Sequence, residues 1–106
     1  MGMTAGTVAA QDPAVVSPNN FKVEIDNPWV RVLRLKQGSH EKTPVYQSPA
    51  YVVVYLGDAD QKLTGPDGKS REVKHKMGEA YYSDGGKRSV QNLSSEPLEQ
   101  IIVELK

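Results

Sequence analysis

The chain has 106 residues, with 13 lysines and arginines balanced by 13 aspartates and glutamates, and it contains no cysteine. This length fits one domain with a single core or one closed barrel. A balanced charge argues against a surface built for nucleic acid or an acidic membrane. The lack of cysteine excludes disulfides, thiolate metal sites and cysteine nucleophiles. The apolar runs are shorter than the roughly 20 residues that cross a bilayer.

Residues 1–20 show neither strand nor helix periodicity and predict a flexible N-terminal tail. Within this tail, Val8-Ala9-Ala10 followed by Gln11-Asp12-Pro13 resembles the end of a secretory signal peptide, with small residues before the cleavage point. The charged start and long apolar region of such a signal are missing. The stretch is therefore either a trimmed signal remnant, which implies a periplasmic or secreted protein, or an ordinary tail.

From residue 21 onward the pattern is that of short β-strands. Phe21, Val23 and Ile25 alternate with charged residues, the period of a strand with one solvent-facing side. Residues 50–56 form a continuous β-branched and aromatic run, as expected for a strand covered on both faces. Gly65-Pro66-Asp67-Gly68 is typical of a hairpin turn. Further strands are expected over residues 30–36, 61–64, 69–73, 80–83, 88–92 and 98–105.

About eight short strands with regular turn signals and no helical stretch predict an all-β sandwich or barrel. Closure into a barrel would also limit the exposed sheet edges that a small β-domain must manage. We therefore expect one β-barrel domain over residues 21–106, preceded by the flexible tail.

Local phrases in the chain suggest a more specific architecture. In chain order these phrases are Val30-Arg31-Val32-Leu33-Arg34, Pro66-Asp67-Gly68-Lys69, Gly78-Glu79-Ala80, Val90-Gln91-Asn92-Leu93 and Ile102-Val103-Glu104-Leu105-Lys106. Their order and spacing resemble a small single-domain cupin of the cupin-2 type. The resemblance implies a double-stranded β-helix, a jelly-roll-like barrel, whose interior usually holds a metal through histidines.

The resemblance also shows where the metal ligands would stand. Small cupins carry His-x-His and then Glu in a first motif, and His-x-x-x-Asn in a second. Here the His-x-His positions fall on Tyr46 and Ser48, the Glu position near Val52, and the second-motif His on Arg88, while Asn92 keeps its place. A phenol with a pKa of about 10, a hydroxyl, an alkyl group and a permanent cation are poor substitutes for imidazole. The sequence therefore predicts a barrel without metal or other cofactor.

Arg88 is the most informative of these replacements. A buried guanidinium needs a partner, and the alternatives are Asp84 or Glu79 within the chain or an anionic ligand whose carboxylate or phosphate fits the guanidinium fork. The tyrosines gather in the same motifs, but Tyr81 and Tyr82 cannot both line the cavity because neighbours on a strand face opposite ways. The candidate ligand-binding residues at the barrel mouth are Tyr46, Ser48, Tyr82, Arg88 and Asn92.

These observations favour a metal-free cupin-like barrel that binds a small anionic or aromatic molecule, or that has lost an ancestral activity. The alternative is a metal-independent isomerase or lyase that uses Tyr46 and Arg88, with His40 as a further candidate base. A metal-dependent enzyme with an unorthodox site is a third and weaker hypothesis. His40 and His75 lie in polar segments between strands and are expected at the solvent surface.

The partners expected are therefore a small-molecule ligand and neither nucleic acid nor membrane. A homodimer is a further hypothesis, because the alternating strand at residues 21–25 and the nearby Trp29 could pack against a second copy.

Overall fold

A computed structural model describes residues 11–106. No helix within this range is long and apolar enough to span a membrane. Its elements are α2 (Pro13–Val16), β1 (Phe21–Asp26), β2 (Val30–Gln37), β3 (Tyr46–Ser48), β4 (Tyr51–Tyr55), β5 (Ala59–Thr64), β6 (Ser70–His75), β7 (Ala80–Ser83), β8 (Gly86–Asn92) and β9 (Leu98–Leu105).

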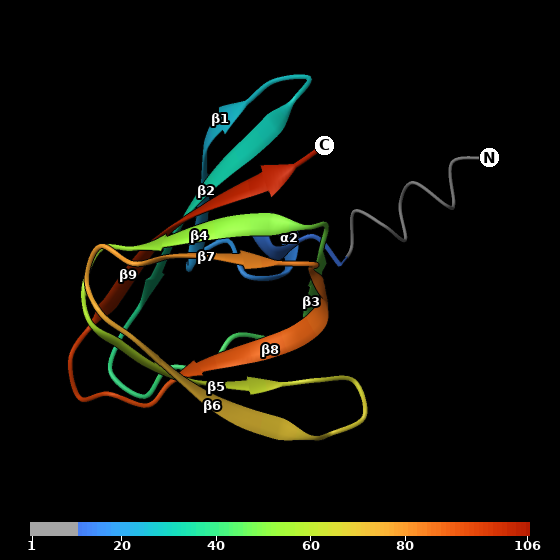
Figure 1. Ribbon diagram of the computed structural model, residues 1–106. Coiled ribbons are helices and arrows are strands. Elements are labelled where there is room, and N and C mark those ends of the chain that lie inside the picture. Colours follow the sequence, from blue (N-terminus) through green and yellow to red (C-terminus); the bar gives the residue numbers. More distant parts are fainter. Residues whose placement is uncertain (1–10) are drawn as a thin grey trace.

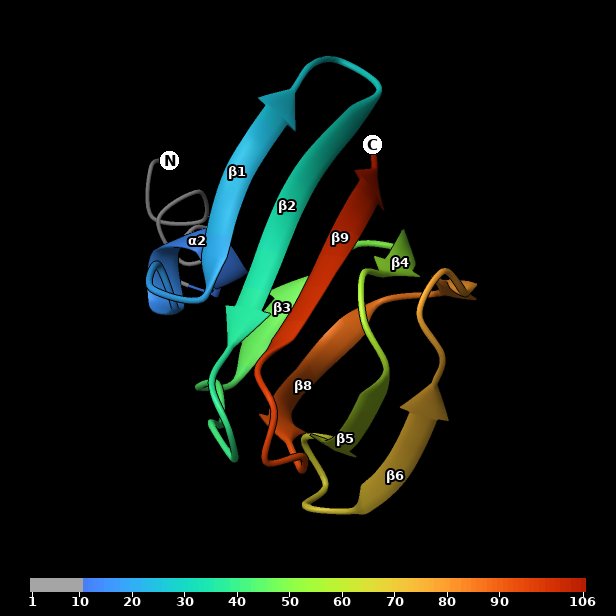
Figure 2. The ribbon, with the colours of Figure 1, turned by 90° about the vertical axis from the view of Figure 1, so that its left-hand side faces the viewer.

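The strands form two antiparallel sheets that face each other (Figure 1). One sheet has five strands in the order β1-β2-β9-β4-β7, and the other has four in the order β3-β8-β5-β6. Figure 2 shows β1, β2 and β9 side by side as one curved layer. The prediction of an all-β barrel is confirmed. The expected strands recur within a few residues, whereas β3 and α2 were not expected as separate elements.

Side chains along each strand face alternately inward and outward, and this alternation determines which residues lie between the two sheets. On β4, Tyr51, Val53 and Tyr55 are buried while the residues between them are partly exposed. On β9 the buried positions alternate between apolar and polar residues, because Gln100 and Glu104 point inward along with leucine and isoleucine. Buried polar groups need partners. The inner surface is therefore only partly an apolar core.

Residues 11–20, which belong to the predicted tail, pack against the barrel in the segment before β1. Asp12 caps α2 by accepting a hydrogen bond from the Ala14 amide at 2.9 Å. Its two carboxylate oxygens also accept bonds of 2.7 Å from the Arg31 guanidinium. Pro13 is buried, and the Gln11 carbonyl accepts a 2.8 Å bond from the backbone of Gln47 on β3.

The remainder of the predicted tail, residues 1–10, lies outside the described residues. This part includes Val8-Ala9-Ala10, on which the signal-peptide hypothesis depends.

Candidate ligand-binding site

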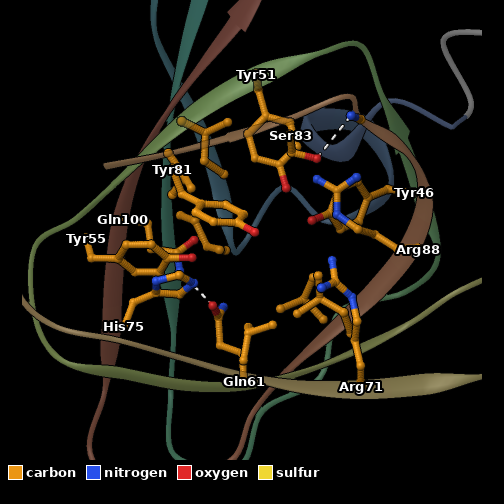
Figure 3. A pocket seen from close by; sticks show the side chains of 17 residues that line it. Tyr46, Tyr51, Tyr55, Gln61, Arg71, His75, Tyr81, Ser83, Arg88 and Gln100 are labelled. Atoms are coloured by element: carbon orange, nitrogen blue, oxygen red, sulfur yellow. Dashed lines mark hydrogen bonds between the residues drawn. The ribbon is translucent and has the colours of Figure 1, made fainter. Parts of the chain in front are cut away.

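A cavity of about 130 Å³ lies between the two sheets (Figure 3). Its walls combine apolar side chains with aromatic and polar ones from eight different strands. The aromatic and polar residues that line it are Tyr46, Tyr51, Tyr55, Gln61, Arg71, His75, Tyr81, Ser83, Arg88 and Gln100. A concave wall of mostly aliphatic and aromatic side chains with a few convergent polar groups is typical of a small-molecule site.

Arg88 lies between two tyrosine rings at one side of this cavity. It pairs directly with Tyr46 across the β3–β8 ladder. The central carbon of its guanidinium is 4.9 Å from the ring centre of Tyr46 and 4.7 Å from that of Tyr51. The guanidinium also donates hydrogen bonds of 3.2 Å to the Ser48 hydroxyl and to the Gly86 carbonyl. These contacts fix the cation by its faces and one edge without neutralising its charge.

The two carboxylates considered as possible partners of Arg88 form other contacts. Asp84 accepts a hydrogen bond from the Tyr82 hydroxyl at 3.1 Å, and Glu79 contacts His75 and the backbone of Lys76. Among residues 11–106, Arg88 forms no ion pair with a carboxylate.

A second arginine, Arg71 on β6, lines the same side of the cavity (Figure 3). It too has no carboxylate partner in the described part of the chain. Sequence analysis missed Arg71. The period-2 pattern of Arg71, Val73 and His75 could have placed all three on one face of a strand, but it could not show that this face meets Arg88.

The opposite side of the cavity contains His75, which was expected at the solvent surface. The structure corrects this expectation, because the imidazole stacks on Tyr55 with ring centres 4.4 Å apart and an interplanar angle of 17°. The Tyr81 ring lies 5.1 Å away on another side. Nδ1 of His75 is 3.2 Å from a carboxylate oxygen of Glu79. His40, by contrast, is exposed, as expected.

A pair of buried amides lies beside this histidine. Gln100 on β9 donates a 2.9 Å hydrogen bond to the side-chain oxygen of Gln61 on β5. This bond joins the two sheets across the barrel, and both amides line the cavity. The interior therefore has a cationic side formed by arginines and an opposite polar side formed by amides and one imidazole.

Burial keeps the hydroxyl groups of Tyr46 and Tyr55 protonated. Burial raises the pKa of Tyr46 to about 12, although the neighbouring Arg88 charge works in the other direction. Burial, with a smaller contribution from Tyr51, also raises the pKa of Tyr55. At neutral pH these phenols are hydrogen-bond donors and acceptors without a negative charge.

Of the five residues predicted for the site, Tyr46 and Arg88 line the cavity. Ser48 is buried and contacts Arg88, so it supports the site from behind the cavity wall. Both tyrosines are about half exposed, but Tyr81 lines the cavity and Tyr82 points outward. The sequence could not decide which of these two tyrosines faces the interior, and the structure shows that it is Tyr81.

The fifth predicted residue, Asn92, is fully buried and does not line the cavity. Its side-chain nitrogen donates to the carbonyls of Gly38 and Glu96 at 3.0 and 2.8 Å. Its oxygen accepts a 3.0 Å bond from the Ser94 amide. Asn92 thus holds two loops together at the end of β8.

The donor atoms at the expected metal positions do not fit a divalent metal ion. Tyr46 is a neutral phenol next to the Arg88 cation, and Val52 lies on the side of β4 opposite to Tyr51 and Val53. Within residues 11–106, no three histidine, cysteine, aspartate or glutamate side chains are grouped so that they could hold a metal. A resident cation beside Arg88 would also be repelled by it.

Solved structures establish which fold these elements build. A cupin domain from Bordetella pertussis Tohama I superposes with a TM-score of 0.75 at 26% sequence identity, covering 81% of this chain and 91% of that one. The chain is a small cupin-fold protein. An RmlC-like cupin family protein with a double-stranded β-helix fold, from Methanocaldococcus jannaschii, matches with a TM-score of 0.64 at 18% identity, covering 80% and 77% of the two chains.

A third solved structure similar to this cupin-fold protein is that of an uncharacterised conserved protein with a double-stranded β-helix domain from Klebsiella pneumoniae. It has a TM-score of 0.65 and 12% identity, and the match covers 80% of this chain and 74% of that one. No family model and no curated protein sequence matches the chain. The comparisons therefore support the fold, and the function has to be argued from the cavity.

Proposed function

We propose that this cupin-fold protein binds a small, flat organic carboxylate inside its barrel, without a metal ion. The observation that carries this proposal is the pair of guanidiniums, Arg71 and Arg88, that line one side of the cavity without a carboxylate partner in residues 11–106. Two like charges on one wall repel each other, and a bound anion relieves that repulsion.

The shape of a carboxylate suits this wall. A guanidinium presents parallel N–H groups that match the two oxygens of a carboxylate. Ser48 and the rings of Tyr46 and Tyr51 hold the Arg88 side chain before any ligand arrives. Little side-chain entropy is then lost on binding, and this preorganisation favours affinity.

The remaining walls favour a single aromatic ring. The rings of Tyr51, Tyr55 and Tyr81 line the cavity next to its apolar residues. A volume of about 130 Å³ is close to that of engineered apolar cavities that accept benzene, about 150 Å³. A single ring is therefore of the right size for the cavity, and its carboxylate would extend toward Arg71, which is exposed.

Isothermal titration with benzoate tests the proposal. We expect saturable binding that weakens at least about 10-fold when either arginine is replaced, in Arg88→Gln or Arg71→Gln, because a charge-assisted hydrogen bond is lost. Lys87→Gln is the matched control, since Lys87 is an exposed neighbour of Arg88 on the outer face of β8. Equal loss in the control, or no binding of benzoate by the unaltered protein, would refute the proposal.

Inorganic phosphate serves as a second probe in the same titration. The aromatic walls give phosphate nothing to stack on, so we expect it to bind more weakly than benzoate. Tighter binding of phosphate would turn the assignment from an aromatic carboxylate to a phosphorylated ligand.

The alternative of a metal-independent enzyme that uses Tyr46 and Arg88 stays a prediction. Its difficulty is that burial holds the pKa of Tyr46 near 12, so this phenol cannot act as a base at neutral pH. If no carboxylate binds, the remaining hypothesis is a barrel that has lost an ancestral activity.

A further inference from the structure

On the side of the cavity opposite the arginines, the contacts of His75 determine which of its ring nitrogens donates a hydrogen bond and which accepts one. Glu79 accepts a 2.8 Å bond from the Lys76 backbone, and this bond, together with His75, lowers the pKa of the Glu79 carboxyl. An ionised carboxylate only accepts hydrogen bonds. In the neutral imidazole, Nδ1 of His75, 3.2 Å from Glu79, therefore carries the proton, and Nε2 is an acceptor with a free lone pair.

This acceptor is held in place and has no partner in the described part of the chain. The parallel stack on Tyr55 and the tilted contact with Tyr81 fix the plane of the ring. His75 makes no other hydrogen bond among residues 11–106 than the one to Glu79. The cavity thus contains an oriented Nε2 acceptor at the ring edge away from Glu79.

A hydrogen-bond donor lies next to this acceptor. In the β5–β6 ladder His75 pairs with Ala59 and Val73 pairs with Gln61, so Gln61 and His75 are diagonal neighbours on one face of the sheet. The oxygen of Gln61 is occupied by Gln100 at 2.9 Å. The amide nitrogen of Gln61 has no partner among the described residues and remains a donor.

Resting on the carboxylate site proposed above, we infer that the ligand is a para-hydroxylated aromatic carboxylate. Its carboxylate contacts Arg71 and Arg88. Its hydroxyl, on the far side of the ring, donates to Nε2 of His75 and accepts from the Gln61 amide. Figure 3 shows His75 and Arg88 on opposite sides of the cavity with tyrosine rings around the space between them.

A hydroxyl suits this side because it donates and accepts at once. An unsubstituted ring would leave both polar groups without a hydrogen-bond partner inside the cavity, and this lowers affinity. A methoxy group could accept from Gln61 but could not donate to His75. A second carboxylate would offer the imidazole no proton at neutral pH.

Titration of three matched ligands at about pH 8, where imidazole is ordinarily neutral, tests the inference. We expect 4-hydroxybenzoate to bind at least about 10-fold more tightly than benzoate and 4-methoxybenzoate. Equal affinity for 4-hydroxybenzoate and benzoate would overturn the inference while leaving the carboxylate site intact. Failure of all three ligands to bind would overturn both.

His75→Phe tests the role of the acceptor, because phenylalanine keeps the stack on Tyr55 and removes Nε2. In this variant we expect benzoate to bind as before and the preference for 4-hydroxybenzoate to disappear. A retained preference would overturn the inference. Tyr82→Phe is the control, since it removes an outward-facing polar group from β7 and should leave the preference unchanged.

A measurement on the unaltered protein keeps the inference testable even if His75→Phe does not fold. The ¹⁵N chemical shift of His75 Nε2 should move on addition of 4-hydroxybenzoate and stay in place with benzoate at equal saturation. An unmoved Nε2 signal with bound 4-hydroxybenzoate would overturn the inference.

Discussion

Arg31 and Arg88 show how the surroundings of one residue type decide its role. Arg31 donates to Glu104 at 2.9 Å and to Asp12 at 2.7 Å, and these bonds raise the pKa of its guanidinium. Arg88 instead has two aromatic rings and neutral oxygens as neighbours. A satisfied ion pair leaves no capacity for a ligand, whereas a cation held by rings keeps its N–H groups available.

Gly85, at the cavity wall, is the residue at which we expect the largest effect of a single methyl group. Its φ is +82°, and a Cβ there would lie 2.2 Å from the Pro49 carbonyl oxygen. Gly85→Ala should lower the free energy of unfolding by at least about 2 kcal/mol, since the left-handed conformation alone costs about 1–2 kcal/mol. Chemical denaturation measures this loss. Gly57→Ala, with nothing within 4 Å and no positive φ, should change stability little.

The buried phenol of Tyr46 predicts a loss of stability in alkaline solution. The unfolded chain releases this proton near the ordinary pKa of about 10, whereas the folded protein keeps it until about 12. Because the folded state binds more protons in this window, the free energy of unfolding falls as pH rises, by about 3 kcal/mol in all.

Denaturation between about pH 9 and 12 measures this slope. Tyr46→Phe should reduce the slope while leaving the contribution of Tyr55, whose pKa burial also raises. An identical slope in the variant would show that Tyr46 ionises normally in the folded protein.

At the scale of elements, sequence periodicity predicted where most strands lie, but it predicted the inward or outward direction of only some side chains. The alternation in Phe21–Asp26 and the long apolar run around Tyr51–Tyr55 are local properties, and both form strands as expected. The strand Tyr46–Ser48 is only three residues long and follows a proline-containing loop, so no period could emerge. Helix α2 has only four residues, and its capping residue Asp12 is bonded to Arg31, which lies in a distant strand.

The direction of Tyr81 and Tyr82 could not be predicted for a related reason. Alternation says that they face opposite ways, but only the pairing of Val53 with Tyr81 and Val52 with Tyr82 on β4 selects the inward one. Register depends on partners far along the chain. The same applies to His75, whose charged neighbours suggested an exposed turn although its partner Ala59 faces the interior.

The contact between the N-terminal segment and the barrel predicts a local effect of Asp12→Ala. The variant loses the cap of α2, which is worth about 1 kcal/mol, and leaves Arg31 with Glu104 as its carboxylate partner. We expect faster hydrogen exchange at the Gln47 amide, which donates to the Gln11 carbonyl. Asp67→Ala, which removes a similar turn contact in the β5–β6 hairpin, should not affect that amide.

At the scale of the whole molecule, the resemblance predicted the barrel but could not predict its contents. Spacing along the chain located the positions of Tyr46, Ser48 and Arg88. Their mutual contacts, and the meeting of Arg71 with the same wall, depend on how the two sheets close on each other. Closure is a long-range property that a single sequence does not display.

Restoring histidines tests this description of the interior. Tyr46 and Arg88 are cross-strand partners, and Ser48 lies two residues along the same face of β3. The triple variant Tyr46→His, Ser48→His, Arg88→His should therefore gain stoichiometric binding of Zn²⁺ or Ni²⁺, measured by equilibrium dialysis and metal analysis. A control with Gln47→His in place of Ser48→His points that imidazole outward and should bind more weakly.

The hypothesis of a homodimer stays a prediction, and the structure narrows the surface available to it. Phe21 is buried against Tyr46 with ring centres 5.0 Å apart, so it cannot serve an interface. Val23, Ile25 and Trp29 remain exposed around the β1–β2 hairpin. Sedimentation of Ile25→Asp beside the unaltered protein would test this face.

The position of β9 has a consequence for biosynthesis. This strand lies at the centre of the larger sheet, between β2 and β4, and it is the last strand along the chain. A ribosome therefore delivers the β1–β2 hairpin and β4 well before the strand that joins them. Until Leu98–Leu105 emerges, the edges of β2 and β4 that pair with it are exposed and can pair with other nascent chains. The larger sheet, and with it the barrel, can form only after β9 has been synthesised.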